Sequence, residues 1–482
     1  MNSSEQDRMA ETVSSPTYED GKTCDRVCSA DSNFEAAKSC PSPRWNDIWA
    51  AILFVFTLLA FWAIVGFNLF DVYKYFQDNK NAVTDEMRLF GVYTSTISTA
   101  AATSMILAPV LLAFMATIPT IMLHTGFLGC ITMEIGFCVY YHLQNFIFLS
   151  ILTGLIAFAM LLCYLFAIRS FQYTASLMAW TGKTLRRSPG IFLVNIFLMI
   201  FLVVALAGAA ISGVYVVLIG TSSELIKGLS LFFVPFALLY QEEVFQNIGR
   251  VTAVGLFATN YYLGPKSDML DSAVASSLSR ALTYAFGSIC FGSLLSSLLS
   301  FISYLAQTLQ RQEGSLAAAI AQAVADILAK VMKYINTYAF TQVGIYGKSY
   351  MEAARDTLAL LDKSGVVAIV NDNNLGLLIT VATVFIALVA SHVSSLYMDY
   401  RVDPDIFLSL EEAIFTTHLT SLFSFFIAAI ICWCFFSVLR AGVTTLFVCM
   451  AQDMDALHQS DPELASEMVQ RYPFLNCSER SA

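Results

Sequence analysis

The stretch that decides the fold runs from Leu89 to Ile168 and reads LFGVYTSTISTAAATSMILAPVLLAFMATIPTIMLHTGFLGCITMEIGFCVYYHLQNFIFLSILTGLIAFAMLLCYLFAI. Its only charged residue is Glu134. An apolar helix needs about 20 residues to cross a bilayer, so this stretch has room for three membrane spans with tight connections. It predicts a protein that crosses the membrane several times.

The composition of the whole chain supports the same class. Of 482 residues, 57% are hydrophobic and 13% are charged, and the mean hydropathy is +0.66. A soluble domain has roughly 25% charged residues, which keep it dispersed in water. The net charge of −10 argues against a nucleic-acid partner, because phosphate groups are bound by basic surfaces. We therefore expect an all-α, polytopic integral membrane protein whose surroundings are the lipid bilayer.

Five further apolar runs each have the length of one span. They are Ile48–Phe70, Ser188–Ser223, Ala281–Gln310, Asn373–Met398 and Ala413–Leu439. Two more segments are ambiguous, because Leu229–Leu263 and Ser315–Gly347 carry charged residues in their middle. If both cross, most loop Lys and Arg residues fall on the side of the N-terminus, as the positive-inside rule requires for a cytosolic face. We therefore expect about ten transmembrane helices with both termini in the cytosol.

The chain divides into three parts. Residues 1–47 are polar and predict a flexible cytosolic tail. Residues 48–439 form the expected transmembrane transporter domain, and residues 440–482 the expected cytosolic C-terminal tail. Within the domain, the small side chains of residues 287–293 (GSICFGS) predict that neighbouring helices approach closely.

Common enzyme signatures are missing from the sequence. It contains no GxxxxGK[ST] phosphate loop, no GxGxxG, no HExxH and no GxSxG. The five histidines are scattered without metal-ligand spacing. We therefore expect no enzymatic activity, cofactor or metal, and movement of a small solute is the favoured class. The alternatives are a non-transporting membrane scaffold, a lipid-handling protein and an enzyme of phospholipid headgroup exchange.

The strongest site signal is the polar run QEEVFQNIGR at residues 241–250, inside an apolar segment. Each carboxylate costs about 2.5–3.5 kcal/mol to place in hydrocarbon. Glu243 and Asn247 are four residues apart and share a helix face, so they are candidate substrate-binding residues. We expect a broken helix that lines a water-filled cavity. The alternatives are a turn between two half-spans and a structural ion pair between Glu243 and Arg250.

Three more residues complete the set of candidate substrate-binding residues. Glu134 could face a cavity as a counter-charge or proton carrier, or lie protonated against neighbouring helices or near an interface. Tyr240 and Tyr261 lie close in sequence to the polar run. Aromatic faces hold quaternary ammonium groups, so these two rings are candidate walls of the site, with core packing as the alternative.

Four ordered blocks resemble the choline transporter-like family. They are RALTYAFGSICFGSL at 280–294, NTYAF at 336–340 with IYGKSY at 345–350, EV at 243–244 with VTAVG at 251–255 and NYY at 260–262, and TLFVC at 445–449. The loop of residues 71–88 is short and has no Cys and no glycosylation sequon, which is similar to the fungal and protist branch of the family.

The resemblance implies ten spans, cytosolic ends and facilitated movement of choline or a related amine such as ethanolamine. It implies no sodium or ATP coupling, and allows proton exchange. It also implies the plasma membrane, with an organellar membrane as the alternative. It does not assign the residues that contact the substrate, and neither the resemblance nor the residues fix the oligomeric state.

Overall fold

The computed structural model describes residues 44–78, 84–143, 145–168, 171–218, 224–264, 269–313, 316–401 and 410–471. Over these ranges the chain forms helices and no strand, which confirms the all-α fold. The flexible tail expected before residue 44 lies outside the described residues, as do residues 472–482.

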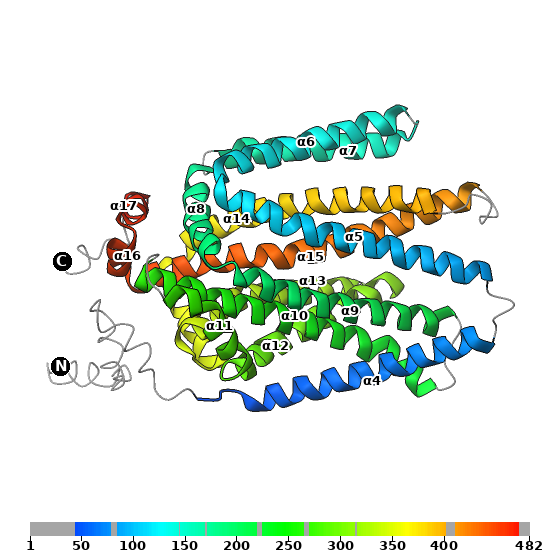
Figure 1. Cartoon of the computed structure of the whole chain (residues 1–482), viewed down its shortest axis with the longest axis horizontal. Coiled ribbons are helices and arrows are strands. Elements are labelled where there is room, and N and C mark those ends of the chain that lie inside the picture. Colours follow the sequence, from blue (N-terminus) through cyan, green and yellow to red (C-terminus); the bar gives the residue numbers. More distant parts are fainter. Residues whose placement is uncertain are drawn as a thin grey trace, which may run out of the picture.

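Over the described ranges, ten long helices run side by side and form the bundle (Figure 1). They are α4 (Ile48–Asp78), α5 (Thr84–Thr117), α6 (Pro119–Leu143), α7 (Ile147–Ala167), α9 (Gly190–Leu218), α10 (Glu224–Leu263), α12 (Phe286–Glu313), α13 (Leu316–Tyr346), α14 (Tyr350–Arg401) and α15 (Leu410–Gln452). In the described part of the chain, four shorter helices lie at one end of the bundle (Figure 1). They are α8 (Phe171–Arg187), α11 (Met269–Leu282), α16 (Met454–Ser460) and α17 (Pro462–Arg471). In Figure 1, α4 begins and α15 ends at this same end of the bundle.

Eight described helices are long and apolar enough to cross a membrane, namely α4, α5, α6, α9, α10, α12, α14 and α15. In α7 the apolar part is shorter, Ser150–Phe166. Asp326, Lys330 and Lys333 lie within α13, which is 31 residues long. The polytopic membrane architecture is confirmed. Of the two ambiguous segments, the one in α10 has the composition of a span, and the one in α13 has the length of a span.

The last long helix, α15, extends past the expected end of the transmembrane domain. It continues beyond Leu439 to Gln452, and its apolar part extends over Leu419–Gln452. The side chains between these two points are mostly apolar and buried, so the helix is stabilised by packing past the position where the transmembrane domain is expected to end.

Helix α10 lies at the centre of the bundle, packed against α4, α9, α12, α13 and α15. Its buried positions Val234, Ala237, Gln241, Val244 and Ile248 recur every three or four residues, which is the spacing of one helix face. Further along, residues 251–258 are all buried. These residues, VTAVGLFA, are mostly small or β-branched, so neighbouring helices surround α10 on every side.

The start of α12 shows why small residues are needed there. A Cβ atom on Gly287 would lie 2.2 Å from the backbone oxygen of Asn46 and 2.5 Å from that of Asp47. The Asp47 carboxylate also accepts hydrogen bonds from the Ser288 hydroxyl (2.7 Å) and the Tyr350 backbone N–H (3.1 Å). The segment before α4 is therefore in direct contact with α12 and α14. The predicted close approach of helices is found at Gly292, where an added Cβ would lie 2.4 Å from the Tyr350 ring of α14 and 2.7 Å from the Phe340 ring of α13.

The helices α6 and α7 form a hairpin at the edge of the bundle (Figure 1). They pack against each other, and α6 also contacts α5, α8 and α14. Large apolar side chains of the hairpin point outward; Phe148 is 77% exposed and Phe166 80% exposed. A surface of this kind is stable in contact with lipid.

Candidate functional site

The polar run of residues 241–250 lies on an unbroken helix. Because α10 is continuous from Glu224 to Leu263, the expected broken helix is wrong, and so is the alternative of a turn between two half-spans. The physical reason is that the polar side chains find hydrogen-bond partners without a break in the helix. Glu243 and Asn247 bond to α12, whereas Gln241, Gln246 and Arg250 bond to other groups of α10. The backbone can therefore keep its helical hydrogen bonds.

Glu243 lies where α10, α12 and α13 meet. Its Oε1 atom accepts a hydrogen bond of 3.1 Å from the Ser296 hydroxyl of α12. The same oxygen lies 3.9 Å from the Lys333 Nζ atom of α13. The Glu243 side chain is 22% exposed and that of Lys333 is 60% exposed. The ion pair that Glu243 forms among the described residues is therefore with Lys333, and the alternative pair with Arg250 is wrong.

Asn247 lies one turn further along α10 and is buried. Its Nδ2 atom donates to the Ser293 hydroxyl of α12 at 2.9 Å. Its Oδ1 atom accepts from Arg250 Nη1, also at 2.9 Å. Glu243 and Asn247 therefore share the face of α10 that meets α12, as their spacing predicts.

Polar contacts between α12 and α13 lie beside the hydrogen bonds that join α10 to α12. The Asn336 Nδ2 atom donates to the backbone oxygen of Gly292 at 3.1 Å, and the Tyr350 hydroxyl donates to Asn336 Oδ1. Burial raises the pKa of Tyr350 to about 12, so this hydroxyl remains a donor at neutral pH. We call the group of these interlocked side chains the polar seam. Its members are Glu243, Asn247, Ser293, Ser296, Lys333 and Asn336.

Tyr240 lies beside the seam, one turn before Glu243. Its side chain is fully buried, and its hydroxyl donates to the Cys290 backbone oxygen at 3.1 Å. Its ring packs edge-to-face on Phe54 with the ring centroids 5.2 Å apart. In this conformation the Tyr240 ring belongs to the aromatic packing between α4, α10 and α12.

The other two candidate residues lie apart from Glu243. Tyr261 is five turns further along α10, about 27 Å by the rise of a helix, and its hydroxyl donates to the Asp453 backbone oxygen at 2.6 Å. Glu134 is half-buried on α6, in the peripheral hairpin. The structure therefore brings together three of the five candidates, Glu243, Asn247 and Tyr240.

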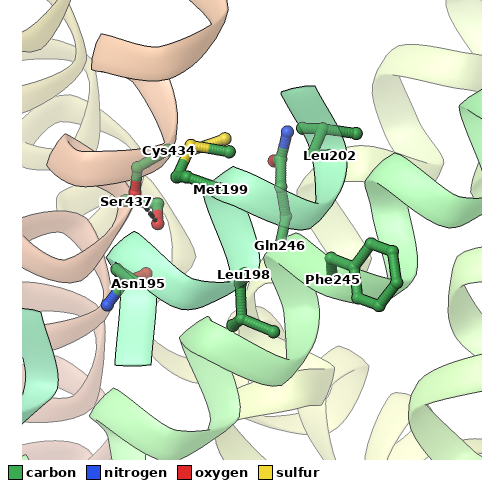
Figure 2. A pocket seen from close by; sticks show the side chains of 8 residues that line it. All are labelled: Asn195, Leu198, Met199, Leu202, Phe245, Gln246, Cys434 and Ser437. Carbon is green, nitrogen blue, oxygen red and sulfur yellow. Dashed lines mark hydrogen bonds between the residues drawn. The ribbon is translucent and has the colours of Figure 1, made fainter. Parts of the chain in front are cut away.

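A second polar group on α10 lies within the polar run but outside the five candidate residues. The Gln246 Nε2 atom donates to Glu242 Oε1 at 2.9 Å, and Gln246 borders a cavity of about 10 Å³. Figure 2 shows the residues that line it, contributed by α9, α10 and α15: Asn195, Leu198, Met199, Leu202, Phe245, Gln246, Cys434 and Ser437. The four-residue spacing of Glu242 and Gln246 is a signal for their hydrogen bond. The lining residues from α9 and α15 are distant from Gln246 in the sequence, so no spacing pattern predicts that they meet it.

This cavity is small compared with an organic solute. A volume of about 10 Å³ has room for roughly one water molecule. A second cavity, of about 20 Å³, lies near the end of α10 and is lined by Trp180, Lys183, Asn260, Ser460 and Asp461. In both places the helices would have to separate before a larger ligand could enter. Among the described residues, no three His, Cys, Asp or Glu side chains gather in a way that could hold a metal ion.

The chain is similar to proteins of one membrane family. A family model described as plasma-membrane choline transporter matches residues 151–455. The protein PNS1 of Debaryomyces hansenii is 26% identical over 91% of this chain and 89% of its own length. A CTL-like protein of Dictyostelium discoideum is 27% identical over 88% of this chain and 74% of its own length. The matched range contains α10, α12 and α13, and therefore the whole polar seam.

Proposed function

The chain belongs to the plasma-membrane choline transporter family, and on that premise we propose that it carries choline or a related small organic cation, such as ethanolamine, by alternating access. Family membership and the apolar helices make it an integral membrane protein with a transporter-like role. The observation that carries the more specific proposal is the position of Glu243, a carboxylate at the junction of three helices inside the bundle.

The chemistry of choline fits this position. A quaternary ammonium group has no hydrogen to donate, so proteins hold it with a carboxylate charge and with aromatic faces. The separation of 3.9 Å between Glu243 and Lys333 exceeds the roughly 2.7–2.9 Å of a hydrogen-bonded ion pair. The carboxylate is therefore able to take up another cation. Tyr240 lies one turn before Glu243 on α10, and Asn247 holds the next turn of α10 on α12.

Alternating access would require α10 to move relative to its neighbours. The cavity beside Gln246 has room for roughly one water, so the described conformation supports a closed state of the carrier. Along the seam, α12 presents the small residues Gly292, Ser293 and Ser296 to α10 and α13. Small residues let the backbones of packed helices approach closely, so the proposed movement of α10 would have to break the hydrogen bonds to Ser293 and Ser296.

The distribution of charge supports one orientation of the bundle across the membrane. Lys183, Arg186 and Arg187 lie in or at the end of α8, at the end of the bundle where α4 begins and α15 ends (Figure 1). Basic residues mark the cytosolic side of membrane proteins. We propose that this end faces the cytosol, that both chain termini lie there, and that the protein transports without catalysing a reaction.

The test is uptake of radiolabelled choline and ethanolamine into vesicles reconstituted with the purified protein. We expect saturable uptake by the wild type, which an imposed proton gradient changes if protons are exchanged. Glu243→Gln should lower uptake at least about tenfold, since it removes the counter-charge. Glu134→Gln is the matched control, a carboxylate outside the seam, and should stay within about twofold of the wild type.

Two outcomes would contradict the proposal at different levels. A wild-type protein without saturable uptake of either amine would favour a non-transporting scaffold or lipid-handling protein. Normal uptake by a correctly inserted Glu243→Gln variant would leave the transport class standing and remove the assignment of the site.

A further inference from the structure

Lys333 is a charge that the proposed binding of an organic cation leaves unused. It lies near the middle of α13, and its Nζ atom is 3.9 Å from Glu243 Oε1. Its side chain is nevertheless 60% exposed. A charged lysine near the middle of a membrane helix is energetically unfavourable in contact with lipid. A nearby carboxylate that offsets its charge would stabilise it there. Glu243 is that carboxylate.

The ion pair is loose compared with another one in the same protein. Lys348 Nζ lies 2.5 Å from Asp356 Oδ2 at the start of α14, which is direct contact. At 3.9 Å, Lys333 attracts Glu243 through charge but does not form a short hydrogen bond. A long, flexible lysine side chain held in this way can leave the carboxylate without a large movement of the backbone.

We propose that Lys333 is a tethered substitute for the transported cation. Its ammonium group neutralises Glu243 when the carrier is empty and moves away when an organic cation binds there. This inference rests on the proposed function of Glu243 as the substrate's counter-charge. The inference goes further, because it explains how the carrier can change conformation when no substrate is bound.

The physical reason is the cost of an unpaired charge away from water. A carboxylate without a partner in a low-dielectric interior is strongly disfavoured. With Lys333 in place, the charge of Glu243 is offset in the empty carrier, as it is when the site holds a cation. The loaded and the empty carrier then meet a similar electrostatic barrier when the site turns from one side of the membrane to the other.

Other basic residues near the seam are placed differently. Arg250 donates to Asn247. Lys330 lies one turn before Lys333 on α13 and is exposed, and no carboxylate lies within 4 Å of it in the described part of the chain. Lys330 is therefore a matched control, with the same charge on the same helix but outside reach of Glu243.

The test separates net uptake from exchange in reconstituted vesicles. Net uptake into empty vesicles requires the empty carrier to return, whereas exchange against internal unlabelled choline uses only the loaded carrier. Lys333→Gln should lower net choline uptake at least about tenfold and leave exchange within about twofold of the wild type. Lys333→Arg, which keeps the charge, and Lys330→Gln should preserve both rates.

The outcomes distinguish this inference from the proposed function. Equal losses of net uptake and exchange in Lys333→Gln would show a structural role and overturn the inference, as would no loss of either. Absence of exchange in the wild type would instead contradict the proposed function itself.

A second readout does not depend on flux. Purified wild-type protein is treated with an amine-reactive reagent, with and without saturating choline, and the labelled lysines are quantified by mass spectrometry. We expect choline to increase labelling of Lys333 and to leave Lys330 unchanged. Labelling of Lys333 that stays constant or falls would contradict displacement of its side chain by the cation.

Discussion

The polar seam and the α6–α7 hairpin each place one carboxylate among apolar helices, but they surround it differently. Glu243 meets a hydroxyl from α12 and an ammonium group from α13. Glu134 lies in a hairpin at the edge of the bundle, and in the described residues no hydrogen bond or ion pair joins it to another side chain. Both residues interrupt an apolar run, and both are candidate substrate-binding residues when the sequence is considered alone.

This contrast indicates that the role of a charged residue inside a span depends on its partners on other helices. The helices that surround Glu243 are held in register by side-chain hydrogen bonds, whereas the outer face of the hairpin is apolar and exposed. Changes in the seam should therefore be costly, and equivalent changes in the hairpin should be tolerated. Each of the following predictions pairs a position in or beside the seam, on α10 or α12, with a position in the hairpin.

The largest effect is expected from a methyl group where two backbones touch. In Gly287→Ala the added Cβ would meet the backbone oxygens of Asn46 and Asp47 at 2.2 and 2.5 Å, so the chain must move. We expect a loss of about 2–3 kcal/mol in the free energy of unfolding. The control is Gly126→Ala in α6, where no atom lies within 4 Å of the added Cβ. It should be neutral or slightly stabilising, since Ala favours helix formation.

Thermal unfolding of both variants in the same detergent checks this prediction. A fall in the unfolding temperature of Gly126→Ala as large as that of Gly287→Ala would mean that the hairpin is packed as closely as the start of α12, which would remove the contrast between the two regions.

A smaller loss is expected when the seam loses one hydrogen-bonding amide. Asn247→Leu removes the donor to Ser293 and the acceptor for Arg250, and should cost about 1–3 kcal/mol. In the hairpin, Thr125 donates only to the Ile121 backbone oxygen of its own helix at 2.8 Å. Thr125→Val should therefore stay within about 0.5 kcal/mol of the wild type. Chemical or thermal unfolding of the two variants gives the comparison, and equal costs would contradict it.

The smallest effect is expected at a single hydroxyl group. Tyr240→Phe keeps the buried ring and loses the hydrogen bond to the Cys290 backbone oxygen, a change of about 1 kcal/mol. Tyr140 of the hairpin is 55% exposed, and Tyr140→Phe should leave stability unchanged. A Tyr240→Phe variant as stable as the wild type would indicate that the ring packing alone holds α10 on α12.

Much of the fold follows from the sequence because hydropathy and spacing encode it locally. The apolar runs predict the helices, and the small residues of 287–293 predict the close approach of neighbouring helices. The shared face of Glu243 and Asn247 follows from a spacing of four residues. Each of these features depends on neighbours within a few turns of the same helix.

The rest depends on contacts between distant parts of the chain. Ser296 is 53 residues from Glu243 in the sequence, and only the packing of α12 on α10 brings its hydroxyl to the carboxylate. The expected broken helix is wrong because the sequence shows polar groups without showing their partners. Tyr261 is close to Glu243 in sequence but distant along an unbroken helix, where every residue adds about 1.5 Å.

The most direct test of the central claim is equilibrium binding of choline to the purified protein. The wild type and Glu134→Gln should bind choline with the same affinity. Glu243→Gln should bind at least about 30-fold more weakly, which corresponds to roughly 2 kcal/mol for a lost charged contact. Equal binding by the wild type and Glu243→Gln, with the loss in Glu134→Gln instead, would place the cation in the hairpin and contradict a binding centre in the polar seam.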